Sequence, residues 1–270
     1  MPCPDYTQSS SVRNRAVEDD GGGSVRTDDG VVSGYRAALD RLRAAQKPSA
    51  GTPLYSRLVN RPLGRRFAAF ASVRGWTPNG VTFRSAACTF TAILLVALLP
   101  PTWWLGVIVS ALLVLGYALD SADGQLARLR GGGSLQGEWL DHTVDAAKVL
   151  TIHVAILISA HRFFELPVAW LLVPIAYLVV DSLLFFGMME RDLLVRAVPG
   201  GTGAPPASTG ILRAILILPS DYGLFCLVFL LLGLPLVFFA VYTVMLVCNA
   251  AFLVLALAKW YRQLGGIARG

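Results

Sequence analysis

The sequence predicts an all-α integral membrane protein with six transmembrane helices, preceded by an amphipathic helix at the membrane surface. Of the 270 residues, 55% are hydrophobic and only 15% are charged, whereas soluble domains carry about 25% charged residues. The apolar residues also form continuous runs of roughly 20 residues, the length that one membrane-spanning helix needs. Because these runs are continuous rather than alternating, helices are favoured over a closed barrel.

Residues 1–52 form a polar N-terminal extension that we expect to be largely disordered. The stretch EDDGGGSVRTDDG is rich in Gly and Asp, and such a composition is too polar to build a packed core. The start of the chain has no apolar segment like that of a signal peptide. Within the extension, YRAALDRLRAAQK has the pattern of a short polar helix, which PSAGTP ends.

Residues 53–76 have the pattern of an amphipathic helix that lies along the membrane surface. Arginine recurs every four residues at Arg57, Arg61 and Arg65, so the guanidinium groups share one face. Pro62 splits or starts this helix because it lacks a backbone N–H. A solvated helix would carry similar charges, but the span that follows favours the membrane surface. The opposite side holds the large apolar residues Leu58, Leu63, Phe67 and Phe70.

Residues 77–270 form the predicted membrane domain, in which six apolar segments are long enough to span a bilayer. The polar residues of ILPSDYG allow the fifth helix to start later than its apolar run. The expected spans are Val81–Leu99, Trp103–Asp120, Trp139–Ala160, Leu166–Phe186, Ile211–Leu232 and Leu234–Trp260.

The distribution of basic residues predicts the orientation of the chain. If the N-terminus lies in the cytoplasm, the outer loops hold Arg162 alone. This asymmetry follows the positive-inside rule, so we expect a multi-pass protein whose N-terminus and aspartate-rich segment face the cytoplasm. The basic residues on the cytoplasmic side are then Arg57, Arg61, Arg65, Arg66, Arg74, Arg128, Arg130, Arg191, Arg196, Arg213, Lys259, Arg262 and Arg269.

Four aspartates lie where the second span ends and the third begins, in LDSADGQLARLRGGGSLQGEWLDHTVDAAK. Asp120 and Asp123 are three residues apart and share one face of a helix, and Asp141 and Asp145 are four apart and share a face of the next. The segment RLRGGGSLQG turns the chain back between them. The two helices therefore present four carboxylates to each other at the membrane surface.

Four carboxylates at the edge of a low-dielectric region repel one another and predict a bound divalent cation, or two. Hard oxygen ligands without His or Cys favour Mg²⁺, Mn²⁺ or Ca²⁺ over Zn²⁺, and paired metals are typical of phosphoryl transfer. Acids also favour the first turn of a helix. That preference would explain Asp141 or Asp145, but not Asp120 at the end of a span.

The residues around the aspartates fit a phosphate ligand. Gly124 and Gly137 let a ligand approach the backbone, and Ala127 is small for the same reason or for helix packing. Arg128 offers a planar set of donors that suits phosphate.

The complete pattern, Asp120-x2-Asp123-Gly124-x2-Ala127-Arg128-x8-Gly137-x3-Asp141-x3-Asp145, resembles the signature of the CDP-alcohol phosphotransferase (CDP-alcohol phosphatidyltransferase) family. All eight specified positions are filled at permitted spacing. TPNGVT, Thr77 to Thr82, is similar to the sequence with which the family begins its first span. Six spans after a surface helix also match the family architecture, so the resemblance covers roughly Leu54 to Arg262.

The resemblance implies a transferase of phospholipid biosynthesis. Such an enzyme moves a substituted phosphate from a CDP-linked donor to an acceptor alcohol and releases CMP. The implied partners are a CDP-linked lipid donor, with CDP-diacylglycerol as the default, a small alcohol acceptor and the lipid bilayer. We expect no nucleic-acid partner. Members of the family are often homodimers, which the sequence itself neither supports nor contradicts.

The resemblance also implies roles for individual residues. Asp120, Asp123 and Asp141 would ligate a dinuclear Mg²⁺ or Mn²⁺ site. Asp145 would complete that site or act as the catalytic base on the attacking hydroxyl. The nucleotide and phosphate ligands would be Gly124, Ala127, Arg128 and Gly137.

Further polar residues could bind the acceptor. Lys148, inside the third span, would contact an anionic substrate, neutralise the aspartates or pair with Asp181 of the fourth span. Asp181 has the same alternatives. Arg191 and Arg213, with Arg196, would suit a phosphorylated acceptor, although the positive-inside rule alone explains most loop arginines.

Two other functions use similar residues. A membrane prenyltransferase would need two separate acid-rich motifs on distant helix pairs, whereas this chain has one compact cluster. A cation transporter would line several spans with carboxylates along their depth, whereas here only Asp181 lies deep outside the cluster. Both are therefore weaker interpretations than the transferase.

Overall fold

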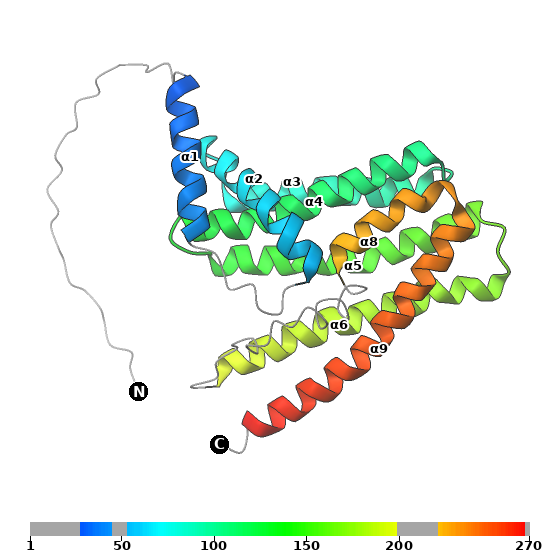
Figure 1. Ribbon diagram of the computed structural model, residues 1–270. Coiled ribbons are helices and arrows are strands. Elements are labelled where there is room, and N and C mark those ends of the chain that lie inside the picture. The colour runs from blue at the N-terminus through cyan, green and yellow to red at the C-terminus, as the bar shows by residue number, and fades with distance from the viewer. Residues whose placement is uncertain (1–27, 45–52, 199–220, 268–270) are drawn as a thin grey trace, which may run out of the picture.

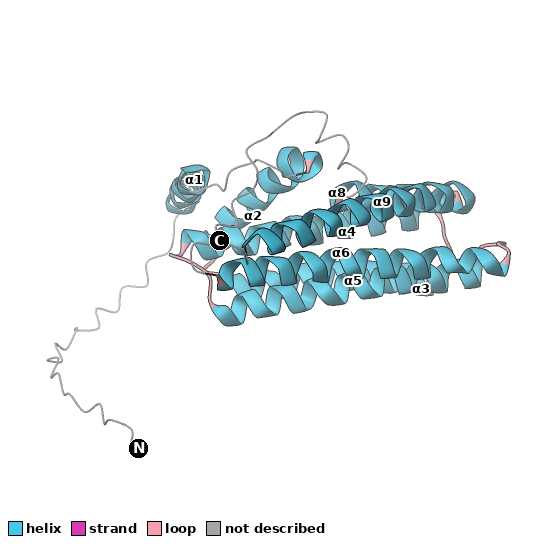
Figure 2. Cartoon of the chain, turned by 90° about the horizontal axis from the view of Figure 1, so that it is seen from below, coloured by secondary structure: helices cyan, strands magenta, loops and turns pink. Residues whose placement is uncertain are grey.

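A computed structural model describes residues 28–44, 53–198 and 221–267, and in these ranges every regular element is a helix (Figures 1 and 2). Five helical segments are long and apolar enough to cross a membrane. They are α3 (Pro78–Leu98), α4 (Trp103–Leu129), α5 (Leu135–Phe163), η2 with α6 (Val168–Leu171 and Leu172–Ala197) and α9 (Pro235–Ile267). The prediction of an all-α, multi-pass membrane fold is therefore confirmed.

A shorter apolar helix stands where the sequence predicts the fifth of six spans. It consists of α8 (Tyr222–Val228) and the 3-10 turn η4 (Phe229–Gly233). The helix begins at Tyr222, as the polar residues before it allow. The first part of the predicted span, from Ile211, lies outside the described residues.

The apolar helices close a ring. Contacts run from α4 to α3, then to α5, α6 and α9, and return to α4 through η4 and α8. Figure 2 shows the long helices alongside one another, with the short α8 beside α4 and α9. The buried apolar core fills the half of the ring that lies away from the chain turn at residues 130–134, and includes Leu113, Ile156 and Phe229.

Capping side chains mark where three of the long helices begin. Thr77, Thr102 and Ser134 each accept a hydrogen bond from a backbone N–H three residues on, at the starts of α3, α4 and α5. These bonds satisfy donors that a helix leaves unpaired at its N-terminus. The polar residues between the apolar runs therefore act as start signals.

Several helices extend beyond the apolar runs that predicted them. The second span was expected to end at Asp120, but α4 continues for nine more residues to Leu129. It continues because Ala122 and Leu126 are buried in a second apolar cluster with α1 and α2. The first half of the aspartate motif, Asp120 to Arg128, thus lies inside α4. The fourth span starts at Val168, two residues after the predicted Leu166, and its first turn, η2, is a 3-10 turn.

The segment before the first span forms one continuous helical element. A π-helical stretch, η1 (Ser56–Asn60), leads directly into α2 (Arg61–Val73), and Pro62 lies at the start of α2. The side chains that α2 buries are small, whereas Leu58 and Phe70 on its other side are exposed. Helix α1 (Asp28–Ala44) lies across the bundle, where it packs on α2 (Figure 1).

Gly64 allows the backbones of α2 and α4 to approach closely. A Cβ atom at this position would lie 2.7 Å from Ser121 Oγ and 2.9 Å from Gln125 Nε2. Gln125 in turn donates to Ser121 Oγ and to the backbone carbonyl of Arg61. Helix α2 is therefore held directly against α4, the helix that carries the first two aspartates.

Asp221 caps two helices at once. Its Oδ1 accepts from Gly223 N at the start of α8, and its Oδ2 accepts from Tyr55 N and Ser56 N at 2.8 and 3.4 Å. The residue is 1% exposed. Burial raises the pKa of this carboxyl, although the three N–H donors act against that rise.

Replacement of Gly64 by Leu is expected to lower the free energy of unfolding by about 1–3 kcal/mol, as overpacking does in tight interfaces. The measurement is thermal unfolding in detergent. Gly265→Leu is the matched control, because a side chain there meets nothing within 4 Å. Equal melting temperatures for the two variants would contradict close packing of α2 on α4.

Asp221→Ala is expected to lower the free energy of unfolding by about 2–4 kcal/mol, because two helix ends lose a cap worth roughly 1–2 kcal/mol each. Asp221→Asn should lose less, since its carbonyl oxygen can still accept. Thermal unfolding measures both, with the exposed Asp40→Ala as control. A loss no greater than that of Asp40→Ala would refute the double cap.

Candidate active site

Three of the four predicted aspartates converge between α4 and α5. Asp120 comes from α4, and Asp141 and Asp145 come from successive turns of α5. One carboxylate oxygen from each lies within 4.8 Å of the other two. As expected, α4 and α5 bring acidic groups of both helices together.

Lys148 links the two helices inside this group. Its Nζ donates to Asp120 Oδ1 at 2.6 Å and to Asp145 Oδ1 at 2.9 Å. A third, longer contact of 3.4 Å reaches Ser85 Oγ on α3. The side chain is 8% exposed, and its three donors are directed at these three oxygens. Of the three alternatives for Lys148, the structure supports neutralisation of the aspartates.

The charges of this cluster fit a divalent cation. Three ionised carboxylates and one ammonium leave an excess of two negative charges. Carboxylate oxygens at this separation are the ligands that Mg²⁺ and Mn²⁺ prefer. Asp120, Asp141 and Asp145 could hold such an ion. His142, which the sequence analysis did not treat as a ligand, lies near Glu138 instead.

Asp123 is the predicted ligand that does not belong to the group of three. Its carboxylate is 6% exposed and accepts a 2.6 Å hydrogen bond from Thr82 Oγ1 of α3. Helix α3 thus supports both α4 and α5, since Ser85 also contacts Lys148. The sequence analysis missed Thr82, Ser85 and Thr89 as site residues, although their spacing of three and four marks a polar stripe on an apolar helix.

The small residues of the motif lie beside polar groups. The Arg128 guanidinium lies next to Gly124: a Cβ at Gly124 would be in contact with Arg128 Nη1, at 3.5 Å. A Cβ at Gly137 would lie 3.1 Å from Asn79 Oδ1 of α3. Arg128 itself is exposed and Ala127 half-buried. Asn79 is a further residue of this region that the sequence analysis did not single out.

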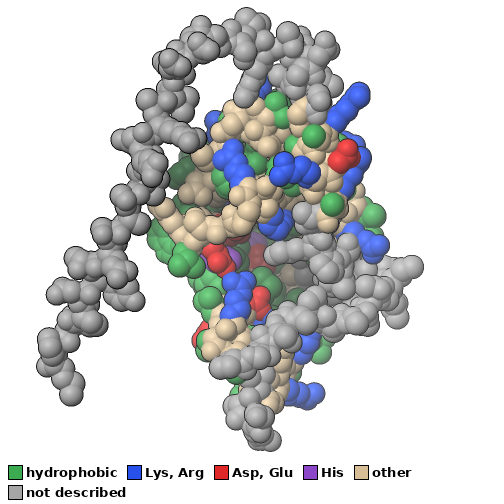
Figure 3. Space-filling model, turned by 90° about the vertical axis from the view of Figure 1, so that its left-hand side faces the viewer, with side chains coloured by type: hydrophobic (Ala, Val, Ile, Leu, Met, Phe, Trp, Pro, Cys, Tyr) green, Lys and Arg blue, Asp and Glu red, His purple; other side chains and the backbone are tan. Residues whose placement is uncertain are grey.

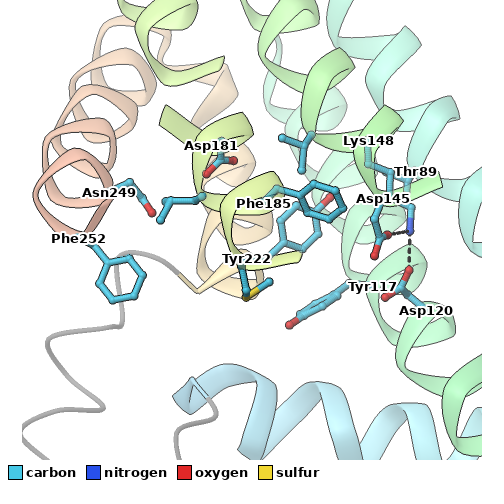
Figure 4. Close-up of a pocket in the computed structure, with 13 residues that line it drawn as sticks. Thr89, Tyr117, Asp120, Asp145, Lys148, Asp181, Phe185, Tyr222, Asn249 and Phe252 are labelled. Carbon is cyan, nitrogen blue, oxygen red and sulfur yellow. Dashed lines mark hydrogen bonds and ion pairs between the residues drawn. The ribbon is translucent and has the colours of Figure 1, made fainter. Parts of the chain in front are cut away.

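A cavity of about 350 Å³ opens next to the aspartates (Figure 4). Asp120, Asp145 and Lys148 line one end of it, and Asp181 and Asn249 line the other. Helices α3, α4, α5, α6, α8 and α9 all contribute to its wall. The remaining lining residues are Thr89, Tyr117, Val149, Leu184, Phe185, Met188, Tyr222 and Phe252.

Asp181 pairs with a buried histidine and not with Lys148. His153 is 0% exposed, and its Nε2 lies 3.1 Å from Asp181 Oδ2 while its Nδ1 lies 2.7 Å from the Tyr242 hydroxyl. The ring stacks on Tyr177, whose hydroxyl accepts from Asn249. This network joins α5, α6 and α9, which are distant in the sequence, and was not predicted.

The loop arginines proposed for a phosphorylated acceptor do not line the cavity in the described part of the chain. Arg191 is bonded to the neighbouring Asp192, and Arg196 pairs with Glu138 of α5 at 2.7 Å. Arg213 lies outside the described residues. Figure 3 shows Lys and Arg side chains around a recess that contains acidic groups, at the end of the bundle where α5 and α6 meet.

Comparison with known families gives one match. A family model described as CDP-alcohol phosphatidyltransferase matches residues 76–258, about two thirds of the chain. The matched range includes the aspartate cluster, Lys148, Asp181 and the cavity. No match was found among curated proteins.

Lys148→Met is expected to destabilise the metal-free protein by about 2–3 kcal/mol, because partly buried carboxylates lose their cation. Added Mg²⁺ or Mn²⁺ should recover most of this loss, so the metal-induced rise in melting temperature should be larger than in the unaltered protein. The control is Arg196→Met, which breaks an exposed ion pair worth at most about 1 kcal/mol. Equal metal-induced shifts in the two variants would contradict a cation site at these carboxylates.

Proposed function

Because the chain belongs to the CDP-alcohol phosphatidyltransferase family, we propose that it transfers the phosphatidyl group of CDP-diacylglycerol to an acceptor alcohol in a reaction that requires Mg²⁺ or Mn²⁺ and releases CMP. The family alone implies transfer of a phosphatidyl group from a CDP-alcohol. The observation that supports the fuller proposal is the meeting of three carboxylates beside a cavity of substrate size.

Asp120, Asp141 and Asp145 are the residues proposed to hold the metal, and Asp123 is proposed to ligate a second ion. The bound metal would neutralise the diphosphate of the donor and stabilise the charge that develops on the phosphate oxygens. Lys148 keeps Asp120 and Asp145 facing each other at distances of 2.6 and 2.9 Å from its ammonium. The carboxylates therefore need little rearrangement on binding, which favours preorganised catalysis.

The cytidine and phosphates of the donor are proposed to lie along the motif residues that follow the aspartates. Gly124 and Gly137 carry no side chain and Ala127 adds little bulk, and the groups next to the two glycines are the polar side chains of Arg128 and Asn79. The Arg128 guanidinium is exposed above Gly124 and suits a phosphate. Asn79 faces Gly137 and offers hydrogen bonds to a base.

In the proposed reaction, the hydroxyl oxygen of the acceptor attacks the phosphorus that carries the diacylglycerol. The new P–O bond forms as the P–O bond to CMP breaks, and CMP leaves with the bridging oxygen. Asp145 is the proposed base for the hydroxyl proton, because its carboxylate both lines the cavity and belongs to the cluster. Asp141 does not line the cavity, so its proposed role is that of a metal ligand and not of a base.

The site is proposed to face the cytoplasm, where nucleotide-linked donors are made. The support is electrostatic: basic side chains surround the end of the bundle that holds the aspartates (Figure 3). Cytoplasmic segments of membrane proteins carry such an excess of Lys and Arg.

The test is CMP release by the purified protein from CDP-diacylglycerol, with a panel of acceptor alcohols. Activity should require Mg²⁺ or Mn²⁺ and disappear with a chelator. Asp145→Asn should lower kcat by about 10²–10⁴, as expected for loss of a general base, and Asp120→Asn should weaken metal binding. Glu165→Gln removes an exposed carboxylate outside the site and is the control.

Failure of the protein to bind any CDP compound in a metal-dependent manner would refute the proposal. Undiminished activity of Asp145→Asn would refute the role of Asp145 as base and leave the reaction class standing.

A further inference from the structure

The cavity beside the aspartates has two polar ends separated by apolar walls. Asp120 and Asp145 lie at one end, and Asp181 with Asn249 at the other (Figure 4). The walls between them are mainly apolar, with Val149, Leu184, Phe185, Met188 and Phe252. Sites of this kind hold small molecules through a few polar groups that determine orientation.

The far end of the cavity presents a carboxylate whose position is determined by buried groups. His153 is fully buried with both ring nitrogens engaged, one by Tyr242 and one by Asp181. His153, Tyr242 and Asp181 all form hydrogen bonds if the imidazole is neutral. Its Nδ1 then accepts from the Tyr242 hydroxyl, and its Nε2–H donates to Asp181 Oδ2. Asp181 then remains a hydrogen-bond acceptor; its side chain is 31% exposed and lines the cavity.

The charges of the cavity discriminate between kinds of acceptor. A carboxylate attracts hydroxyl and ammonium groups and repels phosphate. Among the described lining residues the one cation is Lys148, and its ammonium already contacts Asp120 and Asp145. A phosphate group placed in the cavity would therefore lose its hydration without gaining a cationic partner from the described lining residues.

We propose that this cavity is the acceptor site of the transferase, and that it selects an unphosphorylated alcohol with a second hydroxyl or an ammonium group that binds Asp181. This inference rests on the proposed function above. The reacting hydroxyl lies at Asp145, and the second donor group of the acceptor reaches Asp181 at the opposite end. His153 and Tyr242 are positioning residues, since they act through Asp181 and do not line the cavity.

The experiment compares matched pairs of acceptors in the CMP-release assay, with CDP-diacylglycerol and Mg²⁺ or Mn²⁺. The pairs are glycerol with glycerol 3-phosphate and myo-inositol with inositol 1-phosphate, because the phosphorylated member of each pair still has free hydroxyls that can react. We expect kcat/KM to be at least tenfold higher for an unphosphorylated member than for its phosphorylated partner. Metal-dependent binding of CDP-diacylglycerol is measured in parallel, without any acceptor.

Variants of the Asp181 network separate acceptor recognition from a structural effect. Asp181→Asn should raise the KM for the acceptor by about 10- to 100-fold, the range for losing a hydrogen bond to a charged group. The KM for CDP-diacylglycerol should change less than twofold. Tyr242→Phe should raise the acceptor KM by a smaller factor. Glu190→Gln, which removes an exposed carboxylate from the same helix, should change neither value.

The outcomes distinguish this inference from the proposed function. Loss of metal-dependent binding of CDP-diacylglycerol in the unaltered protein would refute the proposed function and the inference with it. If the donor binds but no unphosphorylated acceptor leads to CMP release, the inference is wrong and the proposed function stands. An unchanged acceptor KM in Asp181→Asn would likewise overturn it.

Discussion

The contact of one ammonium with carboxylates of two helices is the interaction on which this site depends. Lys148 lies between Asp120 of α4 and Asp145 of α5. Without a cation, these carboxylates would repel each other across the inside of an apolar ring, where electrostatic forces are poorly screened. The ammonium holds the helices in register before any metal binds, and the remaining two negative charges match one divalent ion. The lysine is thus part of the electrostatic framework of the cluster, and its donors are directed at the protein itself.

The ring of helices explains why the aspartate cluster and the cavity are one site. Asp120 and Asp145 belong to the group of three carboxylates and also line the cavity. A donor diphosphate near the cluster and an acceptor in the cavity would therefore meet at the same two side chains. The opposite wall is built by α6 and α9, whose Asp181 and Asn249 are tied to the buried His153–Tyr242–Tyr177 network. Reaction chemistry and acceptor choice would thus depend on different helices of one ring.

Close packing through small residues gives the ring its dimensions. A side chain at Gly116 of α4 would collide with Thr89 and the backbone of Ser85 on α3. This close approach brings Ser85 within reach of Lys148 and Thr82 within reach of Asp123. On the other side of α4, Gly64 brings α2 against Ser121 and Gln125. Small residues at helix contacts are typical of membrane bundles, where van der Waals packing largely replaces the hydrophobic effect between helices.

The sequence by itself determined the helical membrane class, because continuous apolar runs of spanning length have no other stable form in lipid. It also predicted that four aspartates of two helices would meet, because the spacing within each helix and the glycine turn between them are local features. Asp120, Asp141 and Asp145 do meet, whereas Asp123 accepts a hydrogen bond from Thr82 of α3 instead. Only the tertiary structure decided the partners of Lys148 and Asp181, since both depend on which helices become neighbours in the ring. It likewise decided that α4 would continue past Asp120, because the apolar cluster that stabilises this part of the helix is completed by α1 and α2, which are distant in the sequence.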